Sequence, residues 1–212
     1  MIIDYESPAY QMKRRAMWQG QFNGAYYYSK EIRKYIIPRI NTTRNWITIN
    51  IPGFGVDHSI VFIHNNLNPR RYDWMKRYKD LILVVGVPET ASKVAHLGKT
   101  IYLPLPIDEA NVAQYKCKKD KDVCYAGRGK KFIGKKVKGD PICDLPREMM
   151  LEKMAHYKKC YAVGRTAIEA KILGCEILPY DPRFPDPSIW KVFSYEDAVK
   201  CLQEKLDEID SN

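Results

Sequence analysis

The stretch YAVGRTAIEAKILGCEILPYD, residues 161–181, decides the fold expected for this chain. A short apolar run is followed by Gly164-Arg165-Thr166, then by a helix-like segment, Gly174 and a second apolar run. This order is typical of a strand, a tight turn, a short helix and another strand. In such a unit, backbone N–H groups and the positive end of the helix point at the turn and favour an anion there.

The rest of the chain repeats this alternation. Runs rich in apolar, β-branched or aromatic residues predict strands at 46–51, 59–64, 80–85, 100–103, 123–126, 160–163 and 175–178. Helical patterns and their end signals predict helices at 25–37, 68–78, 88–97, 146–157 and from Ser194 onward. Segment 103–122 has little periodicity and is expected to be a connection. Alternating strands and helices favour an α/β fold with parallel sheets, here two small Rossmann-like domains at 1–106 and 107–212.

Composition and charge exclude several classes of protein. The chain has 212 residues, 45% of them hydrophobic, which is typical of a globular protein and not of a disordered one. No apolar run approaches the roughly 18 residues of a membrane-spanning helix. The six cysteines form neither a CxxC pair nor a zinc-ligand spacing. Because the N-terminal residues also lack a signal-peptide pattern, we expect a cytoplasmic location.

The net charge of +10 comes mostly from one segment. Residues 116–138 hold ten Lys or Arg against Asp120 and Asp122. Such a segment attracts phosphate groups from a nucleotide, a nucleic acid or an anionic membrane surface, and it is equally typical of a solvated lysine-rich loop. Charge alone does not choose among these partners.

Several polar or glycine residues lie at or just beyond the carboxyl ends of expected strands. They are His64, Gly86, Arg128 and Arg165. Ligands of parallel α/β sheets bind at the carboxyl ends of the strands, so these positions mark a candidate binding edge. Asp57-His58, on a loop expected to face the same site, is a second candidate.

Three segments in this order resemble GT-B glycosyltransferases. They are SIVFIHNN (59–66), DLILVVGVPETASKVAHLGKTIYLPLPID (80–108), and VCYAGR (123–128) together with GRTAIEAKILGCEILPY (164–180). The resemblance implies two Rossmann-like domains that face each other, in a truncated form. The N-terminal domain would hold the acceptor and the C-terminal domain a nucleotide-sugar, with no metal and no separate cofactor.

The resemblance also implies roles for individual residues. Gly164, Arg165 and Thr166 would contact the donor diphosphate, and the Glu169 carboxylate would accept hydrogen bonds from two ribose hydroxyl groups. Arg128, with Lys131 or a neighbouring lysine, would offset the charge that builds on the leaving diphosphate. His64 would face the acceptor, and would take its proton if the enzyme inverts the anomeric centre.

A second interpretation is a protein that keeps this fold without catalysis and binds a nucleotide or a nucleic acid. Members of the family commonly carry another Glu eight positions before the ribose-binding one, and Tyr161 stands at that place here. The second half is also shorter than is usual in the family. A nucleic-acid partner would contact the basic segment 116–138.

Overall fold

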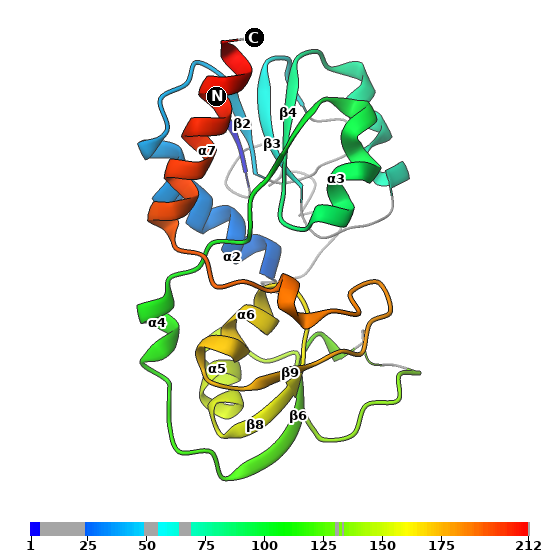
Figure 1. The fold of residues 1–212 in the computed structure, drawn as a ribbon, viewed down its shortest axis with the longest axis vertical. Coiled ribbons are helices and arrows are strands. Elements are labelled where there is room, and N and C mark those ends of the chain that lie inside the picture. The colour runs from blue at the N-terminus through cyan, green and yellow to red at the C-terminus, as the bar shows by residue number, and fades with distance from the viewer. Residues whose placement is uncertain (5–23, 49–54, 64–68, 130–131, 133, 212) are drawn as a thin grey trace. The chain divides into compact units, whose positions relative to one another are not determined.

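The computed structural model describes residues 1–4, 24–48, 55–63, 69–129, 132 and 134–211 (Figure 1). These residues form two compact units, each built on a sheet of parallel strands. The first unit comprises Met1–Pro104 and Tyr195–Asn212, and the second comprises Leu105–Ser194. The predicted α/β class with two parallel sheets is confirmed.

The boundary between the units lies close to the one expected after residue 106. The end of the chain differs from the expectation, because residues 195–212 pack with the first unit and not with the second. The chain therefore leaves the first unit after Pro104 and returns to it at Tyr195. This return depends on the amphipathic pattern of the last helix, whose partner the sequence does not identify.

The first unit contains a five-stranded sheet with the order β1-β2-β3-β4-β5. The order along the sheet is thus the order along the chain. Its strands are β1 (Ile2–Ile3), β2 (Asn45–Ile47), β3 (Ser59–Ile63), β4 (Leu81–Val85) and β5 (Lys99–Tyr102). Its helices and helical turns are α2 (Gly24–Glu31), η1 (Ile32–Ile36), η2 (Ile37–Arg39), η3 (Pro69–Arg77), α3 (Pro88–Val94), η4 (Ala95–Leu97) and α7 (Tyr195–Asp210).

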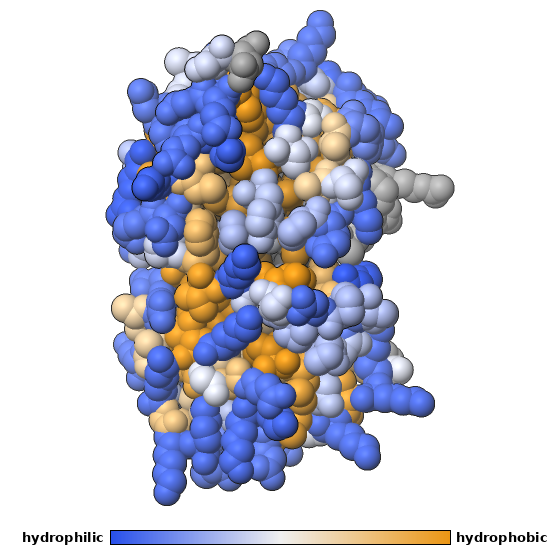
Figure 2. All heavy atoms as spheres, in the orientation of Figure 1, coloured by the Kyte–Doolittle hydropathy of each residue, from blue (hydrophilic) through white to orange (hydrophobic). Residues whose placement is uncertain are grey.

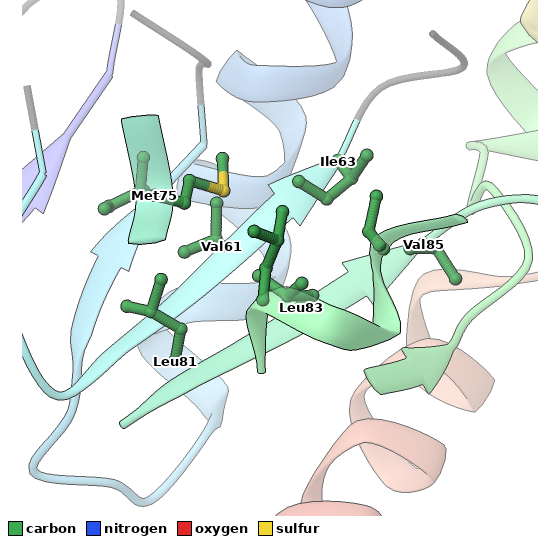
Figure 3. Packing of buried hydrophobic residues seen from close by; sticks show 9 residues of the cluster. Val61, Ile63, Met75, Leu81, Leu83 and Val85 are labelled. Atoms are coloured by element: carbon green, nitrogen blue, oxygen red, sulfur yellow. The ribbon is translucent and has the colours of Figure 1, made fainter. Parts of the chain in front are cut away.

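The core of this unit forms on the central strands. All five residues of β3 and all five of β4 are buried, as their continuous apolar sequences predict for strands covered on both faces. Alternate residues share a face of the sheet. One such set packs together as shown in Figure 3: Val61, Ile63, Leu81, Leu83 and Val85 from the strands, and Met75 from η3.

The C-terminal helix α7 is held to the first unit by an apolar stripe and by polar contacts. Tyr195, Ala198, Leu202 and Leu206 are buried at helical spacing. Val199 and Ile209 lie at the same helical spacing and are only half-buried. The ring of Tyr195 packs on Tyr35, with 4.6 Å between the ring centroids.

Arg44 connects the far end of α7 to the amino end of the sheet. Its side chain is 6% exposed and donates to Asp80 Oδ2 at 2.9 Å and to Asp210 Oδ1 at 2.8 Å. His58 Nδ1 lies 2.5 Å from the same oxygen of Asp80. Burial disfavours the charged form of Asp80, but the hydrogen bonds with His58 and Arg44 outweigh it and lower the pKa of this carboxyl.

The second unit contains a four-stranded parallel sheet with the order β7-β6-β8-β9. Its strands are β6 (Lys121–Gly127), β7 (Asp140–Cys143), β8 (Tyr157–Tyr161) and β9 (Glu176–Leu178). Its helices are α4 (Glu109–Ala113), α5 (Arg147–Ala155), α6 (Arg165–Ile172) and the short turn η6 (Pro187–Ile189). The sequence did not predict α4 or β7: α4 lies within the connection expected at 103–122, and no element was expected at the place of β7.

Figure 2 shows one face, on which hydrophilic side chains surround smaller areas of apolar surface. Among the described residues, the exposed large hydrophobic side chains are Met1, Tyr102, Met149 and Val192. Within the same part of the chain, no helix combines the length and apolar character that crossing a bilayer requires.

Replacing Arg44 by Ala is expected to loosen the last turns of α7. Asp80 and Asp210 would lose charge-assisted hydrogen bonds, but both are about half exposed and can be hydrated, so we expect a loss of about 1–3 kcal/mol. Hydrogen exchange of the α7 amides measures it. Arg39→Ala is the matched control, because its pair with Glu196 is exposed and should contribute less than about 1 kcal/mol. Equal effects of the two variants on exchange of the α7 amides would show that Arg44 does not hold the last turns of this helix.

The Asp80 carboxylate also predicts a pH dependence. Because its pKa is lowered in the folded chain, its stabilising contribution is complete above the ordinary carboxyl pKa of about 3.9 and disappears as the pH falls below it. The difference in unfolding temperature between wild type and Asp80→Asn should therefore be largest near neutral pH and shrink below about pH 4. Glu208→Gln, on the exposed face of α7, serves as a control. A difference that stays constant down to pH 3 would exclude this role of Asp80.

Candidate functional site

The strand order of the second unit reverses direction between β6 and β8. The chain leaves β6 toward β7 on one side and leaves β8 toward β9 on the other. In open parallel sheets, such a reversal separates the connecting loops at the carboxyl ends of the strands, and ligands bind in the crevice between them. Arg128 follows β6, and the turn Gly164–Thr166 follows β8. The two segments singled out in the sequence of this unit therefore flank its switch point.

These two segments also approach each other closely. A Cβ atom added to Gly127 would lie 3.7 Å from Thr166 Oγ1. Gly127 has φ of +119°, a conformation that favours glycine. At Gly129 a Cβ atom would lie only 2.8 Å from Asp144 Oδ2, which accepts a hydrogen bond from the Gly129 amide at 3.0 Å. The glycines on both sides of Arg128 thus allow its loop to pack against its neighbours.

The start of α6 presents backbone amides at this edge of the sheet. Gly164 is its N-cap residue, with φ 65° and ψ −140°, and as a glycine it has no side chain that could cap the helix. The amides of Ala167 and Ile168 both bond to the Gly164 carbonyl, so the first turn is closed internally. The amides of Arg165 and Thr166 come earlier still. An α-helix supplies no carbonyl acceptor for amides in its first turn. The positive end of α6 thus lies beside Arg128's loop.

The other end of α6 is closed by a Schellman motif. The Cys175 amide donates to the Ala170 carbonyl, and the Gly174 amide to that of Lys171. Gly174 has φ of +83°, as this motif requires. The helix between the two glycines is short and its inner face is buried, which holds its first residues at one position on the sheet.

Glu169 lies one turn into α6, with its carboxylate withdrawn from solvent. Its side chain is 2% exposed, and Oε1 accepts hydrogen bonds from Nε of Arg147 at 2.8 Å and from Nε of Arg165 at 3.0 Å. Arg147 is not among the site residues that the sequence predicts. It is the first residue of α5, after the unpredicted strand β7, so the signal that could have found it was Pro146-Arg147 at a helix start.

A further ion pair lies after β9 at the same edge. Arg183 donates to Asp181, with Nε 2.9 Å from Oδ1. The hydrogen bond from Arg183 lowers the pKa of Asp181, although burial opposes it. The positive charge of Lys135 also lowers this pKa. The carboxyl edge of this sheet therefore gathers cationic groups after each strand: Arg128, Arg147, Arg165 and Arg183, with Lys135 in the β6–β7 connection.

The β6–β7 connection covers the opposite face of the sheet from α5. Cys160 of β8 contacts Met154 of α5, and Cys124 is its partner across β6 and β8. Tyr125, the next residue of β6, points to the other face, where Phe132 packs on it with a centroid distance of 4.9 Å. A loop anchored by an aromatic ring therefore replaces the helix that commonly covers such a face.

Other predicted site residues lie elsewhere or outside the described residues. His64 and Lys131 fall outside them, so their roles stay predictions. Gly86 directly follows β4, at the carboxyl edge of the first sheet. His58 precedes β3 and lies at the opposite, amino edge, where it contacts Asp80 and Thr43. The expectation that Asp57-His58 faces the same site as His64 does not fit this position.

The basic segment 116–138 does not gather at one end of the sheet. Lys121 begins β6 and Arg128 follows its end, which separates them by about 20 Å at the rise of an extended strand. Near the amino end, Lys158 pairs with Asp122 at 2.8 Å, and Asp120 contacts His156. The two carboxylates of the segment thus pair with basic side chains outside it, and the basic residues of the segment are divided between the two ends of β6. This division gives less support to one continuous nucleic-acid surface.

The cysteines provide no nucleophile or metal site at this edge. All six are free thiols in the described ranges, and Cys124, Cys160 and Cys175 are buried. Burial raises the pKa of Cys143 to about 11, which disfavours its thiolate. Among the residues described, no group of three or more His, Cys, Asp or Glu side chains is arranged to hold a metal ion.

Comparison of the chain with protein-family models, with curated proteins and with solved structures finds no match. The resemblance to GT-B glycosyltransferases and the roles that it implies therefore stay predictions. What the site offers chemically follows from the geometry of the second unit alone.

Replacing Gly164 by Ala is expected to destabilise the start of α6. The backbone angles of Gly164 are ones that residues with a Cβ atom rarely adopt, so we expect a cost of about 1–3 kcal/mol. Hydrogen exchange in α6 measures it. Gly174→Asn is the control, because asparagine tolerates the left-handed conformation of a helix end and should cost less than about 1 kcal/mol. A Gly164→Ala variant as stable as wild type would show that this turn is not constrained.

Proposed function

We propose that residues 105–194 bind the diphosphate of a nucleotide-sugar at the β6/β8 switch point, and that the protein is a metal-independent glycosyltransferase. One observation carries the proposal: the Arg128 loop and the start of α6 flank the reversal in strand order, with Gly127 beside Thr166. A parallel sheet offers its ligand site at that point, and amides with arginines there favour a phosphate.

The chemistry assigned to this site is charge stabilisation of a leaving group. An acceptor hydroxyl oxygen forms a bond to the anomeric carbon, while the bond from that carbon to the diphosphate breaks. The nucleoside diphosphate leaves with the electron pair. Arg128, Arg165 and the amides that begin α6 offset the developing charge, a contribution that is often large in catalysis. The acceptor's proton goes to a base, the role predicted for His64.

A second candidate is a nucleotide-binding protein without transferase activity. The small size of the second sheet, with four strands, and Tyr161 at the end of β8 favour it. Both candidates share the diphosphate site and differ only in turnover. Hydrolysis or transfer from a bound nucleotide-sugar decides between them, whereas binding alone does not.

Binding of nucleoside diphosphates is therefore the first test. Wild type should be stabilised against heat by at least one of UDP, GDP, ADP and their sugar conjugates, because a ligand of the folded state raises its stability. Arg128→Ala should weaken that binding about tenfold or more, as expected for the loss of a charge-assisted hydrogen bond. The control is Lys158→Ala, at the amino end of the same sheet, which should bind as wild type does.

Two results would count against the proposal. If no nucleotide or nucleotide-sugar stabilises wild type, the second unit does not hold a nucleotide site. If Arg128→Ala and Lys158→Ala bind a ligand equally well, the site lies away from the β6/β8 switch point.

A further inference from the structure

The carboxylate of Glu169 joins the first residues of two helices. Arg147 begins α5 and Arg165 begins α6, and each donates its Nε hydrogen to Glu169 Oε1. The two helices contact each other along the same unit. Since α5 follows β7 and α6 follows β8, both arginines lie at the carboxyl edge of the sheet. Glu169 therefore sets the position of one guanidinium relative to the other at the edge where the switch point lies.

Burial makes this arrangement costly to rearrange. The side chains of Glu169, Arg147 and Arg165 are 2%, 13% and 11% exposed. A carboxylate that is removed from water depends on charged donors, because its hydration is lost. Turning Glu169 toward the hydroxyl groups of a ribose would exchange hydrogen bonds between two ionised groups for hydrogen bonds from neutral donors.

The arginines have the chemistry that a diphosphate requires. Each uses one of its five N–H donors on Glu169, and Arg147 directs Nη1 toward Asn111 of α4 at 3.4 Å. A planar guanidinium matches two phosphate oxygens at once, but only when its orientation is right. Holding both side chains before the ligand arrives reduces the entropy lost on binding.

We infer that Glu169 is a positioning residue, which orients Arg147 and Arg165 toward the phosphates of the ligand and does not contact the ribose. This inference rests on the proposed diphosphate site and adds Arg147 to it. It replaces the ribose contact that the resemblance implies for Glu169. The two roles predict different effects of removing the charge of Glu169. A positioning residue would affect the affinity for the phosphates, and a ribose contact would affect the affinity for the ribose.

The test compares ligands with and without a ribose on wild type and Glu169→Gln, by calorimetry. The probes are inorganic pyrophosphate, the nucleoside diphosphate that binds best among UDP, GDP and ADP, and its 2′,3′-dideoxy form. Glutamine keeps the shape of the side chain and removes its charge. We expect all three probes to weaken by the same factor, about tenfold or more. Glu176→Gln is the control, since it loses only an exposed pair with Lys159, on the same unit.

The opposite pattern would overturn the inference. If Glu169→Gln binds pyrophosphate as wild type does, and no longer distinguishes the nucleotide from its dideoxy form, Glu169 contacts the ribose and the diphosphate site still stands. If thermal stability falls while all affinities of the folded variant are unchanged, the three residues are only structural. If wild type binds none of the probes, the proposed function fails together with the inference.

Arg147→Lys keeps the test decisive if Glu169→Gln does not fold. Lysine retains the positive charge but lacks the planar fork and the Nε group that bonds to Glu169. We expect it to weaken pyrophosphate and the nucleoside diphosphate by equal factors. Unchanged binding of pyrophosphate would exclude Arg147 from the site.

Discussion

Parallel pairing of the strands is the constraint on which this structure depends. Every strand of both sheets runs in the same direction as its neighbours, so the residues that follow the strands of a sheet meet at one edge. In the second unit this rule brings Arg128, Arg147 and Arg165 from three separate segments to the same side of a four-stranded sheet. The strand order then separates two of the loops. The gathering of positive charge at this edge thus arises from topology before any single side chain is considered.

Much of the fold could be predicted from the sequence, for identifiable reasons. The apolar runs of β3 and β4 and the glycines at both ends of α6 are local signals, and the structure has elements at those places. The strand β7 escaped prediction because its sequence, DPIC, contains aspartate and proline, which are rare in strands. It forms because β6 offers it a parallel partner. The five-residue helix α4 is too short for a periodic pattern, although Asp108 caps it.

The candidate site was predictable only in part. Gly164, Arg165 and Thr166 are adjacent in sequence, so a turn motif identifies them together. Arg147 depends on a contact with Glu169, which lies in another helix, and no local pattern announces such a contact. The burial of Glu169 likewise results from packing between α5 and α6. A helix pattern can show that a glutamate lies near a helix start, but not that two arginines occupy its carboxylate.

The return of α7 to the first unit has a consequence for synthesis on the ribosome. The second unit is continuous in the chain, so it can fold as soon as Ser194 has emerged. The first unit is interrupted, and the helix that carries Leu202 and Leu206 emerges from the exit tunnel only after the second unit. At about 5–20 residues per second, the nascent first unit waits for several seconds without this helix. During that interval its uncovered apolar surface is available to chaperones, and premature termination before Tyr195 would leave the earlier-made unit incomplete while sparing the later one.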